Sequence, residues 1–260
     1  VVHHDSQLDW LAQTPLITPL DVWLKLDTGM HRLGFEPGRV DEIAARLNAI
    51  PQVNAVRYMT HFSCADDLES SDTSEQISLF NAAVADKDGE RSLANSAGLL
   101  GWPAARADWV RPGIMLYGSS PLAGRTAEAL ELQPVMTLTT RLIAVNVRRQ
   151  GDAIGYGADY RCLEDMPVGV AALGYGDGYP RHASSGTPVL VNGQRAMIAG
   201  RVSMDMICID LRACPDARVG DEVVLWGDGL PIDEVAAAAG TIAYELLCGV
   251  GSRVQFEYSA

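Results

Sequence analysis

The sequence predicts an α/β protein in which a parallel sheet covered by helices is followed by a mostly antiparallel β domain. Up to about residue 127, short apolar strands alternate with amphipathic helical segments, which is the pattern of βα units. After a linker around residues 124–133, short apolar runs are separated by Gly, Asn and Asp turns. The predicted domains are therefore residues 1–127 and 128–260.

Each predicted element rests on its apolar periodicity and on the turn residues at its ends. In the first domain we expect strands at Val22–Asp27, Asn54–Phe62, Arg91–Asn95 and Trp109–Tyr117, with helices at Arg39–Ala49 and Thr73–Ala85. In the second we expect strands at Val135–Val147, Val168–Leu173, Pro188–Val191, Gln194–Ala199, Met206–Leu211 and Glu222–Leu225, with helices at Ile232–Ala239 and Ala243–Cys248.

Composition narrows the class of protein. The 260 residues are 48% hydrophobic and 20% charged, a globular profile without a run near the ~20 apolar residues of a membrane span. The first residues resemble no signal peptide. A net charge of -13 without a basic patch weighs against nucleic acid or an anionic membrane as partner. We therefore expect a soluble, cytoplasmic protein.

The cysteines show neither CxxC nor zinc-like Cys/His spacing, so we expect no disulfide framework and no metal site. We expect reduced, mostly buried thiols at Cys64, Cys162, Cys208, Cys214 and Cys248.

Two tyrosines stand between glycines, Tyr156 in IGYGADY and Tyr175 in GYGDGYP. Glycine permits turns at positive φ, so each phenol can project beyond the end of a strand. A projecting phenol can transfer a proton if its neighbours lower its pKa from about 10. The simpler alternative is that both glycine pairs only form turns.

The strand VWLKLD carries Lys25, and the turn after it returns Arg32 towards the strand end. A lone strand lysine is usually a solvated edge residue. In a covered parallel sheet its ammonium would instead be buried, with a shifted pKa or a partner. His61 ends the next strand, where α/β proteins bind ligands, although a single His is more often structural.

The segments SLANSAGLLGW and DWVRPGIMLYG follow the last two strands of the first domain. Asn95 and Ser96 open a helix whose free N–H groups suit an anion, and Gly113 and Ile114 could add backbone donors. The alternative for Asn95 and Ser96 is a plain N-cap. The alternative for Arg111 is a salt bridge.

These segments, with LKLDTGMHRLGF, MTHFS, GRVSMDM and YELLC, resemble the bacterial alanine racemase family, which uses pyridoxal phosphate. The resemblance covers almost the whole chain. It implies the C-terminal part of a TIM-like (β/α)8 barrel followed by the β domain. It also implies a homodimer with shared active sites and a two-base (Tyr/Lys) interconversion of L- and D-alanine, for peptidoglycan or alanine catabolism.

Site roles follow from the resemblance alone. Tyr156 matches the catalytic base on the L-alanine face, and Lys25 matches a lysine that is carbamylated in many members. The substrate-binding positions are Arg32, Tyr175 and Met204; the cofactor-binding positions are His61, Asn95, Ser96, Arg111, Gly113 and Ile114; and the entrance positions are Asp66, Arg181 and Arg201.

The sequence departs from the family at two places. Ser252 stands where some members carry a phosphate-contacting tyrosine. The strand with the Schiff-base lysine is not identified either, because Lys25 is claimed by Arg32 and Lys87 lies in a polar run typical of an exposed loop. We therefore expect a missing N-terminal segment of the same protein, roughly 100 residues that complete the barrel.

Two other functions remain open. One is a broad-specificity amino-acid racemase. The other is a non-catalytic protein that binds pyridoxal phosphate without turnover.

Overall fold

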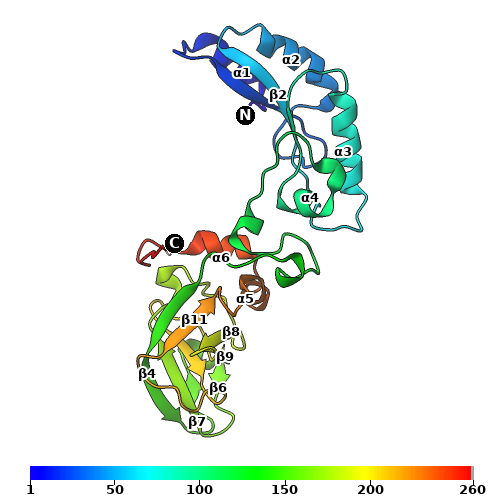
Figure 1. The fold of residues 1–260 in the computed structure, drawn as a ribbon. Helices are drawn as coiled ribbons and strands as arrows, with labels where there is room; N and C mark the ends of the chain where they lie inside the picture. Colours follow the sequence, from blue (N-terminus) through cyan, green and yellow to red (C-terminus); the bar gives the residue numbers. More distant parts are fainter. Residues whose placement is uncertain (259–260) are drawn as a thin grey trace. The chain divides into compact units, whose positions relative to one another are not determined.

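The computed structural model describes residues 1–258 and divides them into two compact units. Unit 1 comprises Val1–Met115 and Pro121–Arg125, whereas unit 2 comprises Leu116–Ser120 and the chain from Thr126 onward. Residues 259 and 260, at the end of the predicted second domain, lie outside the described part. Figure 1 shows the two units, each of which is described by itself below.

The sheet of unit 1 is parallel, as its βα pattern predicts. Its strands are β1 (Leu20–Lys25), β2 (Val53–Met59) and β3 (Arg91–Ser92), in that order across the sheet. Single bridges extend it, from Val2 to Leu24 and from Ser92 to Trp109. The carboxyl ends of three neighbouring strands therefore meet at one edge.

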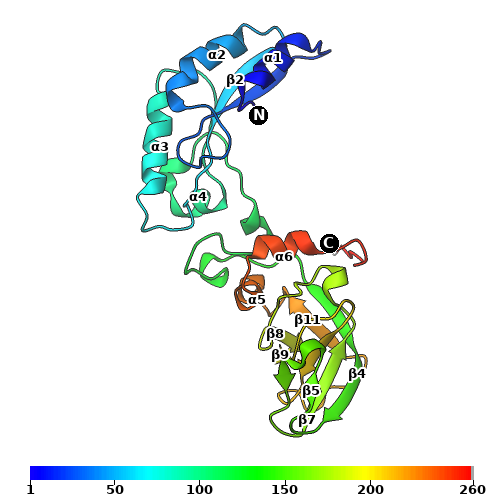
Figure 2. The same cartoon turned by 180° about the vertical axis from the view of Figure 1, so that it is seen from behind.

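The helices of unit 1 lie beside this sheet, as Figures 1 and 2 show. Helix α2 buries an apolar face that includes Ile43 and Leu47, and its Arg46 pairs with Asp5 of α1 at 2.6 Å. The helices of the unit are α1 (Asp5–Gln13), α2 (Val40–Asn48), α3 (Asp72–Ala83) and α4 (Ser96–Gly101), with short 3-10 turns η1 (Pro37–Arg39) and η2 (Pro103–Ala105).

One predicted strand is wrong. Residues Trp109–Tyr117 make a single bridge at Trp109 and then end in the 3-10 helix η3 (Ile114–Tyr117). Pro112 explains the difference, because proline has no N–H to donate to a ladder. Helix α1 was not predicted; its only fully buried side chain is Leu8, so its apolar periodicity is weak.

Unit 2 contains a closed barrel of six antiparallel strands in the order β10-β7-β4-β11-β8-β9. This confirms the antiparallel prediction and adds closure, which leaves no free sheet edge. The strands are β4 (Leu138–Arg148), β7 (Met166–Ala171), β8 (Pro188–Val191), β9 (Gln194–Ile198), β10 (Ile207–Asp210) and β11 (Glu222–Trp226).

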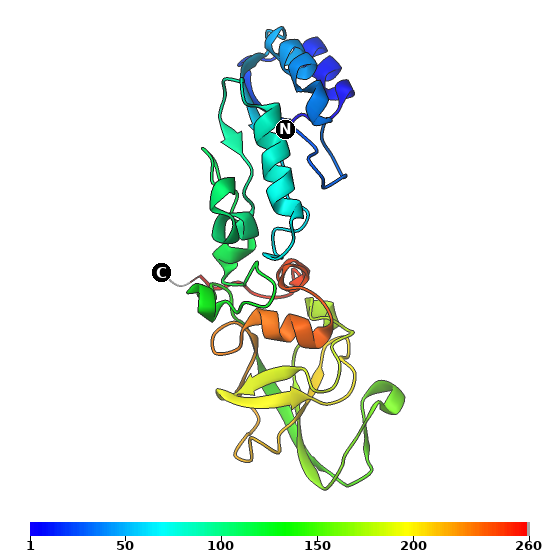
Figure 3. The ribbon, with the colours of Figure 1, turned by 90° about the vertical axis from the view of Figure 1, so that its right-hand side faces the viewer.

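Helices α5 (Ile232–Ala239) and α6 (Ala243–Gly249) lie together at one end of this barrel (Figures 1 and 2). A separate hairpin of β5 (Ala153–Ile154) and β6 (Tyr160–Arg161) holds the 3-10 turn η5 (Tyr156–Ala158), and Figure 3 shows this turn extending away from the barrel strands. The remaining turns are η4 (Glu128–Leu130) and η6 (Tyr175–Asp177). Within residues 1–258, no helix is both long and apolar enough to cross a membrane.

Candidate active site

Lys25 ends β1 and is buried, with 9% of its surface exposed. The chain after it turns back at once, because Phe35 N–H donates to the Lys25 carbonyl and Asp27 N–H donates to the Phe35 carbonyl, each at 2.9 Å. Gly34, at φ +136°, permits this close return, since a Cβ there would lie 2.6 Å from Asp27 N. The closed loop carries Arg32, whose side chain is exposed.

Lys25 and Arg32 interact through space rather than by contact. Within residues 1–258, neither a hydrogen bond nor an ion pair involves the Lys25 ammonium. Burial lowers the pKa of Lys25, and the positive charges of Arg32 and Arg111 lower it further. The structure therefore agrees with the prediction of a buried lysine with a shifted pKa, and the alternative of a solvated edge lysine does not hold.

His61 follows β2 and is half-buried. Burial, together with the charges of Arg111, Lys25 and Arg32, lowers the pKa of His61 to about 4. The imidazole is consequently neutral near pH 7, so it offers a flat polar ring without a charge.

Gln76 of α3 ties the loops after β1 and β2 together. Its side-chain amide donates to Thr28 Oγ1 at 3.3 Å and to the His61 carbonyl at 3.2 Å, and its Oε1 accepts from Ser63 N at 3.0 Å. Thr28 and Thr60 share a further hydrogen bond of 2.7 Å between their hydroxyls. Because Gln76 is only 3% exposed, these bonds hold both strand ends without competition from solvent.

Arg111 lies partly buried across the ends of β2 and β3. It donates to Ser92 Oγ at 2.5 Å, to the Thr60 carbonyl at 2.7 Å and to the Leu93 carbonyl at 3.1 Å. No carboxylate in the described chain pairs with Arg111, so the salt bridge considered from sequence is absent there. Three of the five guanidinium N–H groups are used, which leaves two donors for a ligand.

The segment after β3 contains a helix cap and a second polar contact. Asn95 Oδ1 accepts from Gly98 N at 2.8 Å, which is the plain N-cap considered from sequence. Ser96 Oγ accepts from Gly113 N at 2.7 Å, and Ile114 then begins η3. The Ser96 hydroxyl accepts this bond and can still donate its own proton to another acceptor. Its contact with Gly113 holds the segments around these two residues together, and they form one polar site after β3.

Unit 1 thus gathers cationic groups without matching anions at the carboxyl end of its sheet. The charges of Lys25, Arg32 and Arg111 each contribute to the lowered pKa of His61. Asp27, the nearby carboxylate, already accepts from Gly29 N and His31 N at 3.1 and 2.9 Å. Such a site favours an anionic ligand.

Tyr156 projects from unit 2, as its flanking glycines predict. Its side chain is 71% exposed, and Gly155 and Gly157 adopt φ of +70° and +77°. Asp159, at the end of the same loop, accepts two hydrogen bonds from the Arg201 guanidinium. The exposed phenol therefore sits on a loop whose backbone is fixed by both turn geometry and an ion pair.

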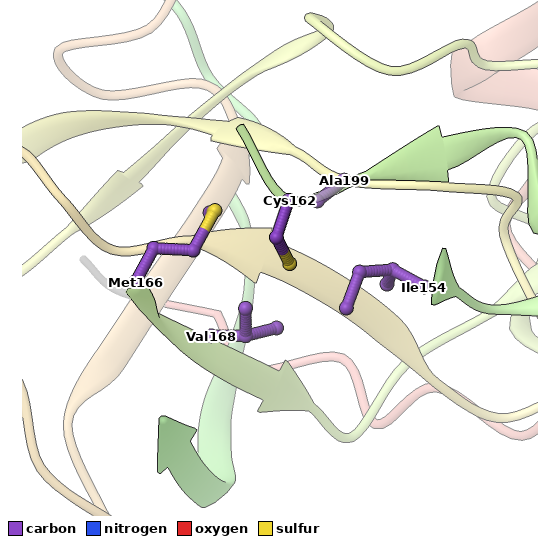
Figure 4. Close-up of a cluster of buried hydrophobic side chains, with 5 residues drawn as sticks. All are labelled: Ile154, Cys162, Met166, Val168 and Ala199. Atoms are coloured by element: carbon purple, nitrogen blue, oxygen red, sulfur yellow. The ribbon is translucent and has the colours of Figure 1, made fainter. Parts of the chain in front are cut away.

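A buried cluster anchors the base of this loop. Ile154 and Cys162, which flank it in sequence, pack with Met166, Val168 and Ala199, and each of the five is at most 4% exposed. Figure 4 shows their side chains gathered between the hairpin and the barrel strands. The loop that carries Tyr156 is thus continuous with the barrel core.

Tyr175 and Met204 lie on adjoining loops of unit 2. Tyr175 N donates to the Ser203 carbonyl at 3.1 Å, and Gly176 N donates to the Met204 carbonyl at 2.8 Å. Tyr175 is 38% exposed and Met204 is 53% exposed. The structure therefore brings these two predicted pocket residues together on one surface.

The predicted entrance residues divide between the units. In unit 2, Arg181 and Arg201 line one cavity of about 350 Å³ together with His182 and Asp159. In unit 1, Asp66 is exposed, and its carbonyl accepts from Ala123 N at 2.9 Å.

Comparison with known proteins bears on both units. The family model described as "Alanine racemase, N-terminal domain" matches residues 1–121, and that described as "Alanine racemase, C-terminal domain" matches residues 135–258. An alanine racemase of Thioalkalivibrio sulfidiphilus is 58% identical over 99% of this chain and 72% of the relative. The chain belongs to the alanine racemase family.

Other members of the alanine racemase family agree with this. An alanine racemase of Vibrio parahaemolyticus is 54% identical over 100% of this chain and 73% of its own length. The crystal structure of the biosynthetic alanine racemase from Pseudomonas aeruginosa is 49% identical, with a TM-score of 0.96 over 100% of this chain and 72% of that one. The expected pairing of a barrel-type N-terminal domain with a β domain is broadly supported, and the closed β-barrel is the C-terminal domain.

The expectation that the N-terminal part with the Schiff-base lysine is lacking is not supported, because the N-terminal family model matches residues 1–121. The polar run around Lys87 is an exposed loop, as predicted, but the Lys87 side chain itself is not free in solvent. Its ammonium lies 2.5 Å from Asp41 and 2.9 Å from Asp86, and the side chain is only 18% exposed. These ion pairs raise the pKa of Lys87, so its amine is protonated.

The cysteines are all free, as predicted, but only Cys162 and Cys214 are buried. Sequence reasoning also missed Gln76, a polar residue that ties two loops together. A signal existed for Gln76, which shares the buried face of α3 with Ile77 and Phe80. A polar residue on such a face needs internal hydrogen bonds.

Proposed function

We propose that this protein is a pyridoxal-phosphate-dependent alanine racemase that interconverts L-alanine and D-alanine. Membership of the family supports the activity. The observation that carries the cofactor site is the group of cations without matching anions at the carboxyl end of the unit 1 sheet. Separately, unit 2 offers the exposed, glycine-flanked Tyr156 as a proton-transfer group. Anion binding and proton transfer are the two tasks that such an enzyme requires.

The residues of unit 1 suit a phosphorylated aromatic cofactor. Ser96 and the Gly113 and Ile114 amides would hold the phosphate, which would replace Ser96 Oγ as the acceptor of the Gly113 N–H, and Asn95 caps the helix that begins at Ser96. His61, neutral at pH 7, would pack at the ring. When bound, pyridoxal phosphate supplies an electron sink for the carbanion that forms when alanine loses its Cα proton.

Arg111 would donate to the ring nitrogen of this cofactor. Its two unused N–H donors make that bond possible while Ser92 and Thr60 keep the guanidinium in place. A guanidinium cannot give up its proton, so the ring nitrogen would stay unprotonated. Arg111 would thereby limit charge delocalisation and suppress side reactions such as transamination.

Tyr156 would remove or return the Cα proton on the L-alanine face, and Arg32 would pair with the substrate carboxylate. Tyr175 and Met204 would line the substrate pocket, and Asp66, Arg181 and Arg201 would guard its entrance. The pocket residues are divided between two domains, which supports a homodimer whose subunits share each site. A subunit carrying Tyr156→Phe and a subunit disabled in cofactor attachment should then regain activity on mixing, and none should return if each site is self-contained.

Lys25 would be carbamylated. A lowered pKa increases the fraction of neutral amine, which can attack CO₂ to form an N–C bond and a carbamate, releasing one proton. The new anion would offset the nearby charges of Arg32 and Arg111. With ¹³C-labelled bicarbonate, NMR should detect one carbamate carbon, and the signal should vanish in Lys25→Ala. An unlabelled wild-type protein would show that another group supplies the negative charge.

The direct test of the function uses the full-length protein with pyridoxal phosphate. Optical rotation of L-alanine should decay to zero, whereas serine and lysine should change far more slowly. Comparable rates with all three would favour a broad-specificity racemase. Cofactor binding without any racemisation would favour the non-catalytic alternative.

A further inference from the structure

Three segments of unit 2 meet where Tyr175 and Met204 lie. They are Gly174–Gly178, which carries Tyr175; Ser203–Asp205, which carries Met204; and Gly249–Arg253, which begins at the last residue of helix α6. Figures 1 and 3 show η6 of the first segment beside α6. None of these contacts was expected from the sequence.

The first two segments approach each other too closely to admit side chains between them. A Cβ at Gly174 would lie 2.2 Å from the Ser203 carbonyl oxygen, and a Cβ at Gly176 would lie 3.0 Å from that of Met204. The third segment is equally close, because a Cβ at Gly178, at φ +106°, would lie 1.9 Å from the Gly249 carbonyl oxygen. The backbones therefore form a tightly packed set.

One side chain joins all three segments. Arg253 Nε lies 3.2 Å from Asp177 Oδ1, and its Nη2 donates to Asp205 Oδ1 at 2.6 Å. The other oxygen of Asp177 accepts from Gly174 N at 2.9 Å, and the Asp177 carbonyl accepts from Gly251 N at 2.7 Å. The guanidinium thus links two carboxylates on two different loops.

We propose that Arg253 is a positioning residue that fixes Tyr175 and Met204 relative to each other for the binding of alanine. The role rests on the proposed function. A single exposed ion pair contributes little, but a fork that spans two carboxylates adds a geometric constraint that lysine cannot reproduce. Asp177 transmits that constraint directly to the backbone of the Tyr175 loop.

The expected effect falls on substrate binding. Arg253 itself touches no reacting atom, and the loops it joins are proposed to line the pocket rather than to move the proton. Arg253→Gln should raise the KM for alanine roughly tenfold while kcat changes by less than about threefold. Asp205→Asn should raise the KM in the same direction but less, because Arg253 keeps its contact with Asp177. The double variant should be no worse than Arg253→Gln, because that substitution already removes the link to Asp205.

Amide hydrogen exchange supplies a readout that does not depend on activity. In Arg253→Gln, the amides of Tyr175 and Gly176 should exchange at least several-fold faster, because they donate to Ser203 and Met204 across the joined loops. Arg253→Lys should give an intermediate exchange rate, and it replaces Arg253→Gln as the test variant if Arg253→Gln does not fold. Arg212→Gln is the matched control, since Arg212 also bonds two carboxylates, Asp210 and Glu164, in the same unit.

The outcomes separate the two proposals. Faster exchange together with a raised KM, absent in Arg212→Gln, supports the positioning role. Unchanged exchange and unchanged KM in Arg253→Gln, or effects equal to those of Arg212→Gln, would overturn it even if the wild type racemises alanine. Absence of racemisation by the wild type would instead refute the proposed function, while the exchange rates would still show whether Arg253 holds the loops.

Discussion

The two units carry their candidate site residues in opposite ways. In unit 1, Lys25 and Arg111 are at least partly buried at strand ends, and backbone carbonyls and hydroxyls fix Arg111. In unit 2, Tyr156, Tyr175 and Met204 are exposed on loops fixed by close glycine packing and ion pairs. The difference teaches that the charges proposed to hold a ligand are built into a sheet edge, whereas the groups proposed to act on the substrate are presented from loops with rigid bases.

The largest expected effect concerns the base of the Tyr156 loop. Met166→Ala should lower the free energy of unfolding by about 2–5 kcal/mol, because it opens a cavity among fully buried side chains. Urea denaturation measures this, with Met197→Ala as control, since Met197 is 40% exposed. A loss below about 0.5 kcal/mol would show that the loop does not depend on this cluster.

The next effect is on catalysis. Tyr156→Phe should reduce racemisation at least about a hundredfold with the cofactor still bound, since a positioned acid–base group is lost. Tyr160→Phe is the control, because Tyr160 begins β6 of the same hairpin but its hydroxyl donates to Asp210 at 3.3 Å. Optical rotation measures the rate of racemisation, and cofactor absorbance measures whether pyridoxal phosphate is still bound. Near wild-type turnover would exclude Tyr156 as a base.

A third prediction concerns the fixed charge of unit 1. Arg111→Gln should lower the free energy of unfolding by about 1–3 kcal/mol, because the buried acceptors Ser92 Oγ and Thr60 O lose their donor. Arg106→Gln should change it far less, since Arg106 is exposed and bonds a single carbonyl, that of Leu99. Equal losses in the free energy of unfolding of the two variants, measured by guanidinium denaturation, would mean that the burial of Arg111 contributes nothing to stability.

A fourth prediction is a pH dependence. His61 has a folded-state pKa of about 4, below the usual value near 6.5, so between these values the unfolded chain binds a proton that the folded chain does not. Stability should therefore fall as the pH drops from 6.5 to 4. In His61→Gln, the contribution of His61 to the fall in the free energy of unfolding between pH 6.5 and 4 should be missing. His4→Gln should retain that contribution. Identical slopes in the wild type and His61→Gln would contradict the lowered pKa.

The sequence predicts regular elements well where apolar periodicity and turn residues agree. Strand β8 and helix α5 have the predicted bounds, and both lie between clear turn residues. Trp109–Tyr117 was mistaken for a strand because its apolar residues outweighed the single Pro112 that prevents a ladder. Barrel closure was not predicted, since it depends on pairing between distant strands such as β9 and β10.

The candidate site was predictable where glycine or strand position constrains geometry. The exposure of Tyr156 followed from its flanking glycines. The contacts of Arg111, Gln76 and Arg253 did not follow, because each joins segments that are distant in sequence. Motif resemblance named the candidate site residues, but the partners that hold them emerged only from the structure.

Tyr156 is proposed to move the Cα proton on the L-alanine face. The most direct measurement is NMR of Cα deuterium incorporation in D₂O by Tyr156→Phe loaded with pyridoxal phosphate. Exchange from D-alanine should persist, because it uses the opposite base, whereas exchange from L-alanine should fall at least about a hundredfold. Equal exchange from both enantiomers would contradict this account.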